Sequence, residues 1–279
     1  MNHLNRRQLL RAMGIAGTGL AITRFSDVSA VGESSASDSM AMQLYKSLND
    51  EQRSKVCLPM DHPRRNFVSN WWYIHPDHRI PKTFDENQQE LIRKIFDSLH
   101  SPEHQDAVNK QVEFDQYGNE KNAPAVGFFG TPDDPNFEFI YTGHHVTRRC
   151  NAHTDEGTGF GGAPIFYGHF REAFNETKDH PGNPYWYQGK IFNEFVQTLN
   201  PDQQQKALAD SRPRSENPKV VIKKKQADWE GLSCAEFNAE QKEVFISTMR
   251  RMLAMFRKDD VDATIASIQS CLLYTSPSP

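Results

Sequence analysis

The sequence has few of the features that mark several common classes of protein. It contains only 4 cysteines in 279 residues and no Cys-x-x-Cys pair, which argues against a disulfide scaffold and against a cysteine zinc site. The sequence still allows one disulfide, between two of the three residues Cys57, Cys150 and Cys234, and does not assign the pair. The sequence has no phosphate-binding P-loop, nucleophile elbow or His-Glu-x-x-His motif, so the chemistry that depends on these motifs is not predicted.

Beyond the first thirty residues, acidic side chains outnumber basic ones. Residues 1–30 hold four arginines against Asp27, a charge of +3 within a total of −4, which leaves −7 on the rest of the chain. An acidic surface disfavours nucleic acid and anionic membranes as partners. The basic run Lys223 to Lys225 follows Val220-Val221-Ile222 and is interpreted as the solvated end of a strand.

The first thirty residues have the pattern of a twin-arginine export signal. Arg6-Arg7 precedes two leucines, a weakly apolar stretch runs from Met13 to Ile22, and Val28-Ser29-Ala30 offers the small residues that signal peptidase requires. The apolar stretch has about ten residues and a bilayer span needs roughly 20, so a membrane anchor or stable membrane insertion is disfavoured. We predict a signal peptide at residues 1–30, a linker at residues 31–40 and a periplasmic location. The expected partners are the twin-arginine export machinery and signal peptidase.

The other end of the chain has an unusual composition. Residues 271–279 are Cys-Leu-Leu-Tyr-Thr-Ser-Pro-Ser-Pro, and their back-translation resembles the end of a transposase-based sequencing adapter. They are expected to be read-through from a sequenced fragment, with the natural C-terminus missing; an ordinary disordered tail is the alternative. Residues 41–270 are then expected to form a single, C-terminally incomplete α+β domain, a length compatible with one large domain.

Four segments share the pattern of a helix start. In each, Asn or Asp at a plausible N-cap is followed three residues later by Gln, whose side chain can reach back to the amide of the cap. The four caps are Asn49, Asp85, Asn200 and Asn238. Apolar residues also recur at helical spacing in three stripes, which predicts helices with a core-facing side. These stripes are Leu91, Ile92, Ile95, Phe96 and Leu99; Ile191, Phe192, Phe195, Val196 and Leu199; and Val244, Phe245, Met249, Met252, Leu253 and Phe256.

The centre of the chain has the patterns of strands. Ala125–Phe129 and Phe137–Thr142 are rich in aromatic and β-branched residues and flank the turn-forming Thr131–Asn136, which predicts a hairpin. Pro164–Gly168 is expected to be a third strand and Val220–Ile222 a fourth. Helices followed by strands and further helices define the α+β class. The prediction is a central, mostly antiparallel sheet flanked by N-terminal and C-terminal helices.

The densest group of candidate site residues follows the predicted hairpin, from Gly143 to His153. Neighbouring residues of a strand face opposite sides, so the strand is expected to continue through His144 and His145 and to place these two histidines on opposite faces. A zinc, iron or copper site needs imidazoles or carboxylates that converge, so only one histidine of this pair is expected to bind a metal. The candidates for its other ligands are His153, His169, Glu156 and residues far away in the chain.

Arginines and glycines near this group are further candidates for ligand binding. Arg148 and Arg149 suit an anionic group because guanidinium forks match carboxylates and phosphates, while surface ion pairing is the alternative for at least one of them. Residues 157–162 satisfy Gly-x-Gly-x-x-Gly, but a polar turn precedes them and a predicted strand follows. A dinucleotide site needs a strand before the glycines and a helix after them, so this cofactor is rejected. We interpret the segment as a flexible loop that can fold over the His/Arg cluster.

Two further stretches combine aromatic and polar residues, Met60 to His75 and Asp179 to Tyr187. Such residues line the pockets of many proteins. Adjacent tryptophans are nevertheless more common in cores, and Trp71 and Trp72 are therefore interpreted as core.

Several of these segments together resemble a known family. The likeness is carried by the four helix starts and by Gly143–Cys150, Gly161–His169 and Asp179–Asn183, and it covers most of residues 40–269. The family is catalogued as domain of unknown function 3500, and the chain is most similar to its twin-arginine-exported bacterial branch. The resemblance implies a further strand region with a His-x-His motif past the end of this chain. That implication agrees with a truncated copy and with the loss of partners for His145, and the family brings no established activity.

Two hypotheses for the function follow. In the first, the chain is a periplasmic enzyme whose catalytic residues are His145, Arg148 and His169, with a transition metal as candidate cofactor bound by His145, His153 and His169. A histidine would serve as ligand or general base and the arginine as an anion clamp. In the second, the same pocket binds a small anionic or sugar-like molecule without catalysis. A bound metal with an open coordination position favours the first hypothesis, and a fully hydrogen-bonded histidine cluster favours the second.

Overall fold

The computed structural model describes residues 39–67, 69–153, 166–167, 185–208 and 231–274. The chain divides into two compact units, residues 1–37 and residues 38–279, and all described residues belong to the second. Several predicted features lie outside the described residues: the signal peptide at 1–30, the linker up to residue 38, Glu156, the glycine-rich loop at 157–162, His169, and the strand Val220–Ile222.

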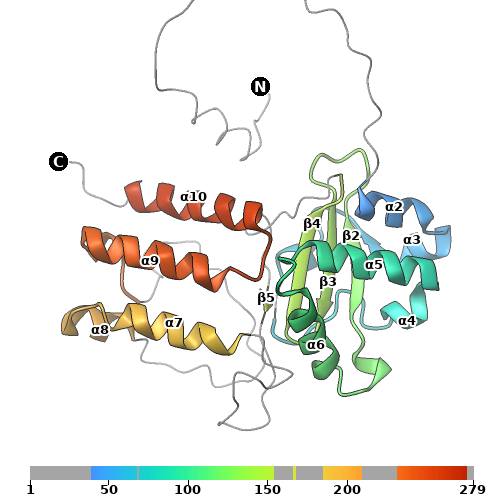
Figure 1. Ribbon diagram of the computed structural model, residues 1–279. Helices are drawn as coiled ribbons and strands as arrows, with labels where there is room; N and C mark the ends of the chain where they lie inside the picture. The colour runs from blue at the N-terminus through green and yellow to red at the C-terminus, as the bar shows by residue number, and fades with distance from the viewer. Residues whose placement is uncertain (1–38, 68, 154–165, 168–184, 209–230, 275–279) are drawn as a thin grey trace, which may run out of the picture. The chain divides into compact units, whose positions relative to one another are not determined.

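A mixed five-stranded sheet organises the described residues, in the order β1-β2-β3-β4-β5 (Figure 1). Its strands are β1 (Cys57–Leu58), β2 (Ala125–Phe129), β3 (Glu138–Gly143), β4 (Val146–Asn151) and β5 (Phe166–Tyr167). β1 is parallel to β2, and the three other neighbouring pairs are antiparallel. The predicted α+β class and the β2–β3 hairpin are confirmed, but the sheet is mixed rather than mostly antiparallel. β1 has only two residues, too few for an alternating pattern to show in the sequence.

The chain reverses direction at His144 and His145, so the prediction of one continuous strand through these residues was wrong. β3 and β4 pair as far as Gly143 opposite Val146, and the two histidines alone form the turn. His145 has a φ of 55°, in the left-handed region that Gly or Asn normally occupies in a tight turn. Neither residue stands here, which is why no turn was predicted.

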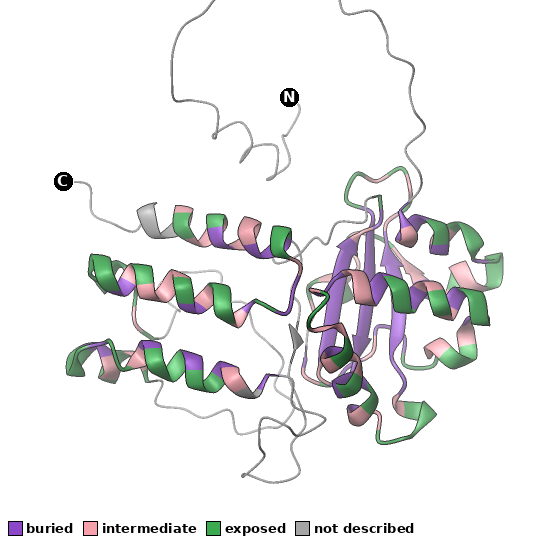
Figure 2. Cartoon of the chain, viewed as in Figure 1, coloured by how far each residue is buried: buried purple, intermediate pink, exposed green. Residues whose placement is uncertain are grey.

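Helices precede the sheet strands β2 to β5. They are α2 (Met40–Ser47), α3 (Asp50–Val56), α4 (Ile80–Thr83), α5 (Glu86–Ser98) and α6 (Gln105–Asp115), with short 3-10 turns at Pro63–Asn66 and Glu120–Asn122. α2 begins at Met40, the last residue of the predicted linker. A common hydrophobic core joins these helices to the sheet through residues such as Leu44, Ile92, Ile95, Phe96, Val108, Phe128 and Phe139. Figure 2 shows β2, β3 and β4 buried along almost their whole length.

A second group of helices follows the sheet. It comprises α7 (Trp186–Val196), α8 (Pro201–Ala207), a 3-10 turn at Cys234–Glu236, α9 (Ala239–Met252) and α10 (Lys258–Tyr274). Phe195, Leu199 and Phe237 form their own buried cluster here. The predicted stripe on α7 is correct except at Phe192, which is 42 % exposed. α10 continues as far as Tyr274, into the segment that was predicted to be read-through.

All four predicted helix starts are capping boxes, and the structure joins them in two pairs. Gln52 of α3 and Gln88 of α5 face each other, and each side-chain amide donates to the oxygen of the other. Each amide also donates to the backbone carbonyl two residues before the other helix's cap. Gln203 and Gln241 repeat this arrangement between α8 and α9. The same residues that start the helices therefore also hold them together in pairs.

Candidate functional site

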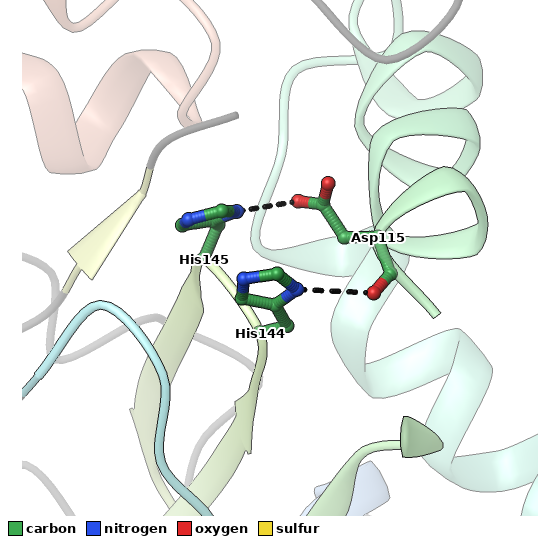
Figure 3. A group of neighbouring side chains, drawn as sticks. All are labelled: Asp115, His144 and His145. Carbon is green, nitrogen blue, oxygen red and sulfur yellow. Dashed lines mark hydrogen bonds and ion pairs between the residues drawn. The ribbon is translucent and has the colours of Figure 1, made fainter. Parts of the chain in front are cut away.

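Three potential metal ligands from two elements converge at the turn between β3 and β4 (Figure 3). Asp115 is the last residue of α6, and His144 and His145 form the turn. One ligand atom from each of the three residues lies within 4.8 Å of the other two. Within the described ranges, this is the only group of three or more His, Cys, Asp or Glu residues that meets this criterion.

Asp115 holds both histidine rings in place. Nδ1 of His144 donates to the backbone carbonyl of Asp115 over 3.1 Å, and Nδ1 of His145 donates to the carboxylate oxygen Oδ2 over 3.0 Å. The two imidazoles stack with their centres 3.9 Å apart and their planes 29° apart. The prediction that the two histidines point to opposite faces was therefore wrong, because they occupy a turn and not a strand.

The side chains of the cluster are largely shielded from solvent. Asp115 is fully buried, His144 is 8 % exposed, and the side chain of His145 is 12 % exposed. Burial, followed by the neighbouring imidazole of His145, lowers the pKa of His144. The His144 ring is therefore neutral at pH 7, and the neutral imidazole is the form that binds metal ions.

Helix α6 positions Asp115 by burying polar residues on its inner face. Its buried residues are Val108, Gln111, Val112 and Asp115, which recur at helical spacing. Nε2 of Gln111 donates to Oδ2 of Asp115, the oxygen that also accepts from His145. Gln111 and Asp115 had not been singled out in the sequence. Two polar residues on a four-residue inner face break the apolar stripe that would have predicted this helix.

The backbone is strained at one residue of the cluster and at one residue beside it. Tyr117 and His145, with φ of 52° and 55°, are the two non-glycine residues with positive φ in the part of the chain that the structure describes. The left-handed conformation costs a side-chain-bearing residue about 1–2 kcal/mol. The ring of Tyr117 lies 5.8 Å from that of His144. Such strain is typical of functional sites, where the surrounding structure maintains it.

Trp71 also lies beside the cluster. It forms a backbone bridge with His144, and the centres of their rings lie 4.7 Å apart. The backbone amide of His145 donates to the carbonyl of Asn70, the residue before Trp71, over 2.6 Å. Trp71 is 46 % exposed while Trp72 is 7 % exposed. The interpretation of this pair as core is therefore right for Trp72 and wrong for Trp71.

Arg148, one of the predicted catalytic residues, is 1 % exposed and makes contacts inside the protein. Its Nε donates to Nε2 of His100 over 2.9 Å, and its Nη2 donates to the hydroxyl of Tyr185 over 3.4 Å. Nδ1 of His100 donates to the carbonyl of Phe96, which leaves Nε2 as an acceptor. Burial, and then the charge of Arg148, hold the pKa of His100 well below its usual value. The role of Arg148 as an anion clamp stays a prediction.

Arg149 forms an ion pair, but not at the surface. Its Nη1 lies 2.5 Å from Oε1 of Glu138, and Arg65 lies 3.2 Å from the other carboxylate oxygen. The side chains of Arg149 and Glu138 are 0 % and 2 % exposed, and burial lowers the pKa of Arg149. The expected surface pairing is thus replaced by a buried pair, which is costly to break.

His153, another predicted ligand, lies away from the cluster. Nε2 of His153 donates to the carbonyl of Asp134 over 2.8 Å, and His153 lies beyond the end of β4, at the opposite end of the β3–β4 hairpin from His145. The structure therefore does not bring His153 to His145. His169 and Glu156 lie outside the described residues, so their roles stay predictions.

The fold and the cluster define an α+β protein with a buried His/Asp group at a hairpin turn. Residues 32–276 match the family described as "Protein of unknown function (DUF3500)", and the chain belongs to this family. No curated protein and no solved structure matches it. In the described part of the chain, no helix combines the length and the apolar character that crossing a membrane requires.

Proposed function

We propose that the protein is an exported enzyme in which Asp115, His144 and His145 bind one divalent transition metal ion. The observation that carries this proposal is the convergence of three donor groups within 4.8 Å at a buried turn. Two imidazoles and one carboxylate are the donor set of non-haem iron(II) sites and of several catalytic zinc sites. Both kinds of site leave coordination positions open for water or substrate.

The contacts of the cluster suit metal binding. The hydrogen bond from Nδ1 of His144 to a backbone carbonyl leaves Nε2 as the ligand atom of this ring, and a hydrogen bond on the second nitrogen is the usual arrangement in metal-binding histidines. Ligands at about 2.1 Å from a metal lie about 3–3.5 Å from one another. Nδ1 of His145 and Oδ2 of Asp115 are already 3.0 Å apart. A metal ion bound between them would replace the proton of this hydrogen bond, and His145 would then carry its proton on Nε2.

The predicted export route is compatible with the same proposal. The Arg6-Arg7 pair and the apolar stretch that follows it favour the twin-arginine route, which carries folded proteins. A metal would then be inserted before the protein crosses the membrane. In the periplasm, the bound ion would activate a water molecule or polarise a substrate oxygen at an open position.

Metal content tests the proposal directly. The purified protein is stripped with a chelator, titrated with Zn²⁺ or with Fe²⁺ under anaerobic conditions, and assayed by elemental mass spectrometry. We expect about one ion per chain in the wild type, and loss of binding in Asp115→Asn and His145→Gln. A bound metal should also raise the free energy of unfolding by about 2.7 kcal/mol at a concentration of 100 times Kd.

His153→Gln is the matched control, because it removes an exposed histidine from the other end of the same hairpin. It should bind metal like the wild type. Circular dichroism establishes that each variant is folded. Equal metal binding by all four proteins, or by none of them, would contradict the proposed site. Turnover of hydrolytic or oxygen-dependent test substrates that disappears in Asp115→Asn would support catalysis, and metal binding without turnover would favour a ligand-binding role.

A further inference from the structure

An exposed aromatic surface lies beside the proposed metal site. Trp71 and Tyr117 are 46 % and 49 % exposed, and both rings lie against His144, at 4.7 Å and 5.8 Å between ring centres. Metal binding by Asp115, His144 and His145 does not use these rings. Large aromatic side chains that stay exposed next to a polar cluster are typical of a surface that contacts a ligand.

The indole of Trp71 is held in a fixed position. Its Nε1 donates to the hydroxyl of Tyr73 over 3.1 Å, and that hydroxyl donates to the carbonyl of Asn122 over 3.3 Å. The guanidinium of Arg79 stacks on the ring of Tyr73 at 3.1 Å. The only polar atom of the indole is thus engaged within the protein. What Trp71 offers to a ligand is therefore a rigid ring surface and not a hydrogen bond.

This surface is within reach of a ligand on the metal. An ion bound to Nε2 of His144 at about 2.1 Å lies at most about 8 Å from the centre of the Trp71 ring, because the two rings are 4.7 Å apart. One six-membered ring attached to the metal through its substituents can bridge that distance. A single small molecule can therefore contact the metal and Trp71 together.

We infer that the site binds a ring-shaped ligand that carries vicinal hydroxyl groups. Neighbouring hydroxyl oxygens can bind a divalent ion at its open positions, while the face of the ring packs on Trp71 and Tyr117. The charge of the ion disfavours a cationic ligand at the same place. Two sources share this chemistry, a pyranose sugar and a catechol. The inference rests on the proposed metal site, since the hydroxyl groups need the ion.

The test uses two probes, methyl β-D-glucopyranoside for the sugar and 4-nitrocatechol for the aromatic diol. Metal content is measured first, and each probe is then titrated calorimetrically into the metal-loaded protein and into the chelator-stripped protein. We expect one of the probes to bind the metal-loaded form, and Trp71→Ala to weaken that binding about tenfold. Trp71→Phe, which keeps a ring face, should weaken binding of the probe less than Trp71→Ala does. Phe192→Ala removes an exposed aromatic of α7 and should bind like the wild type.

The outcomes separate this inference from the proposed function. If the protein holds no metal, the proposed function and this inference fail together. If it holds metal but binds neither probe, the proposed metal site stands and the ligand class is overturned. A Kd that Trp71→Ala leaves unchanged, or that chelation leaves unchanged, also overturns the inference. Metal-dependent and Trp71-dependent binding of either probe supports it, and the probe that binds identifies the source.

Discussion

Acid should destabilise this protein through a buried histidine, His75, that lies outside the candidate site. The residue is 6 % exposed, and its Nε2 donates to the carbonyl oxygen of Val56 over 3.2 Å. The backbone of Gly127 lies against the ring, so that a Cβ at this position would be 2.8 Å from Nε2. Burial, with a smaller contribution from nearby positive groups such as Arg64, lowers the pKa of His75 to about 4.

The direction of the effect follows from the two protonation states. In the unfolded chain the pKa of His75 is near 6.5, so between pH 6.5 and pH 4 the unfolded state binds a proton that the folded state does not. The free energy of unfolding therefore has its full His75 contribution above pH 6.5 and loses it as the pH falls to about 4. The whole difference corresponds to about 3 kcal/mol, of which about 2 kcal/mol is lost between pH 7 and pH 5.

Urea unfolding at pH 7, 6 and 5 measures this loss. His75→Gln is the informative variant, because its side-chain amide can still donate to Val56 but does not titrate. Between pH 7 and pH 5, the free energy of unfolding should fall by about 2 kcal/mol more in the wild type than in His75→Gln. His153→Gln, which removes an exposed histidine, should keep the wild-type dependence on pH. Equal losses in the wild type and in His75→Gln would refute the reasoning.

Three further predictions concern packing and export. Gln88→Leu removes one partner of the α3–α5 amide pair and leaves buried polar groups unsatisfied, so urea unfolding should show a loss of about 3 kcal/mol. Glu138→Gln leaves the guanidinium of Arg149 without a carboxylate, and the same assay should show a loss of about 3–5 kcal/mol. Arg6→Lys combined with Arg7→Lys should retain the precursor in the cytoplasm on cell fractionation; recovery of the variant from the periplasm would contradict the export signal.

The parts of the fold that could be predicted are those with a strong local signal. A capping box needs only residues three positions apart, and all four were recognised. The β2–β3 hairpin was predicted because its turn, Thr131–Asn136, is rich in Pro, Asp and Asn. The parallel pairing of β1 and the partnering of Gln52 with Gln88 could not be predicted, since both depend on contacts between residues far apart in sequence.

The candidate site could be predicted only in part. His145 was identified from the density of histidines around it, and the structure places it in the metal-ligand cluster. Asp115 was missed because nothing in the local sequence distinguishes it from other acidic residues near a helix end. His144 was set aside because an extended strand would separate it from His145. His145 instead has a left-handed conformation, which local preferences disfavour, in a turn where the two rings stack.

Buried polar residues elsewhere in this protein help to separate a structural role from a functional one. The Gln52–Gln88 pair and the Arg149–Glu138 pair satisfy one another, so the stability of the fold is a sufficient reason for their presence. The cluster at Asp115 is different, because it combines a polar inner face of α6, strained backbone and an exposed indole within one small region. The positive φ values of Tyr117 and His145 conflict with local preference, and such conflicts are expected where function requires them. The turn between β3 and β4 is therefore the place where substitutions should affect the proposed metal binding without unfolding the protein.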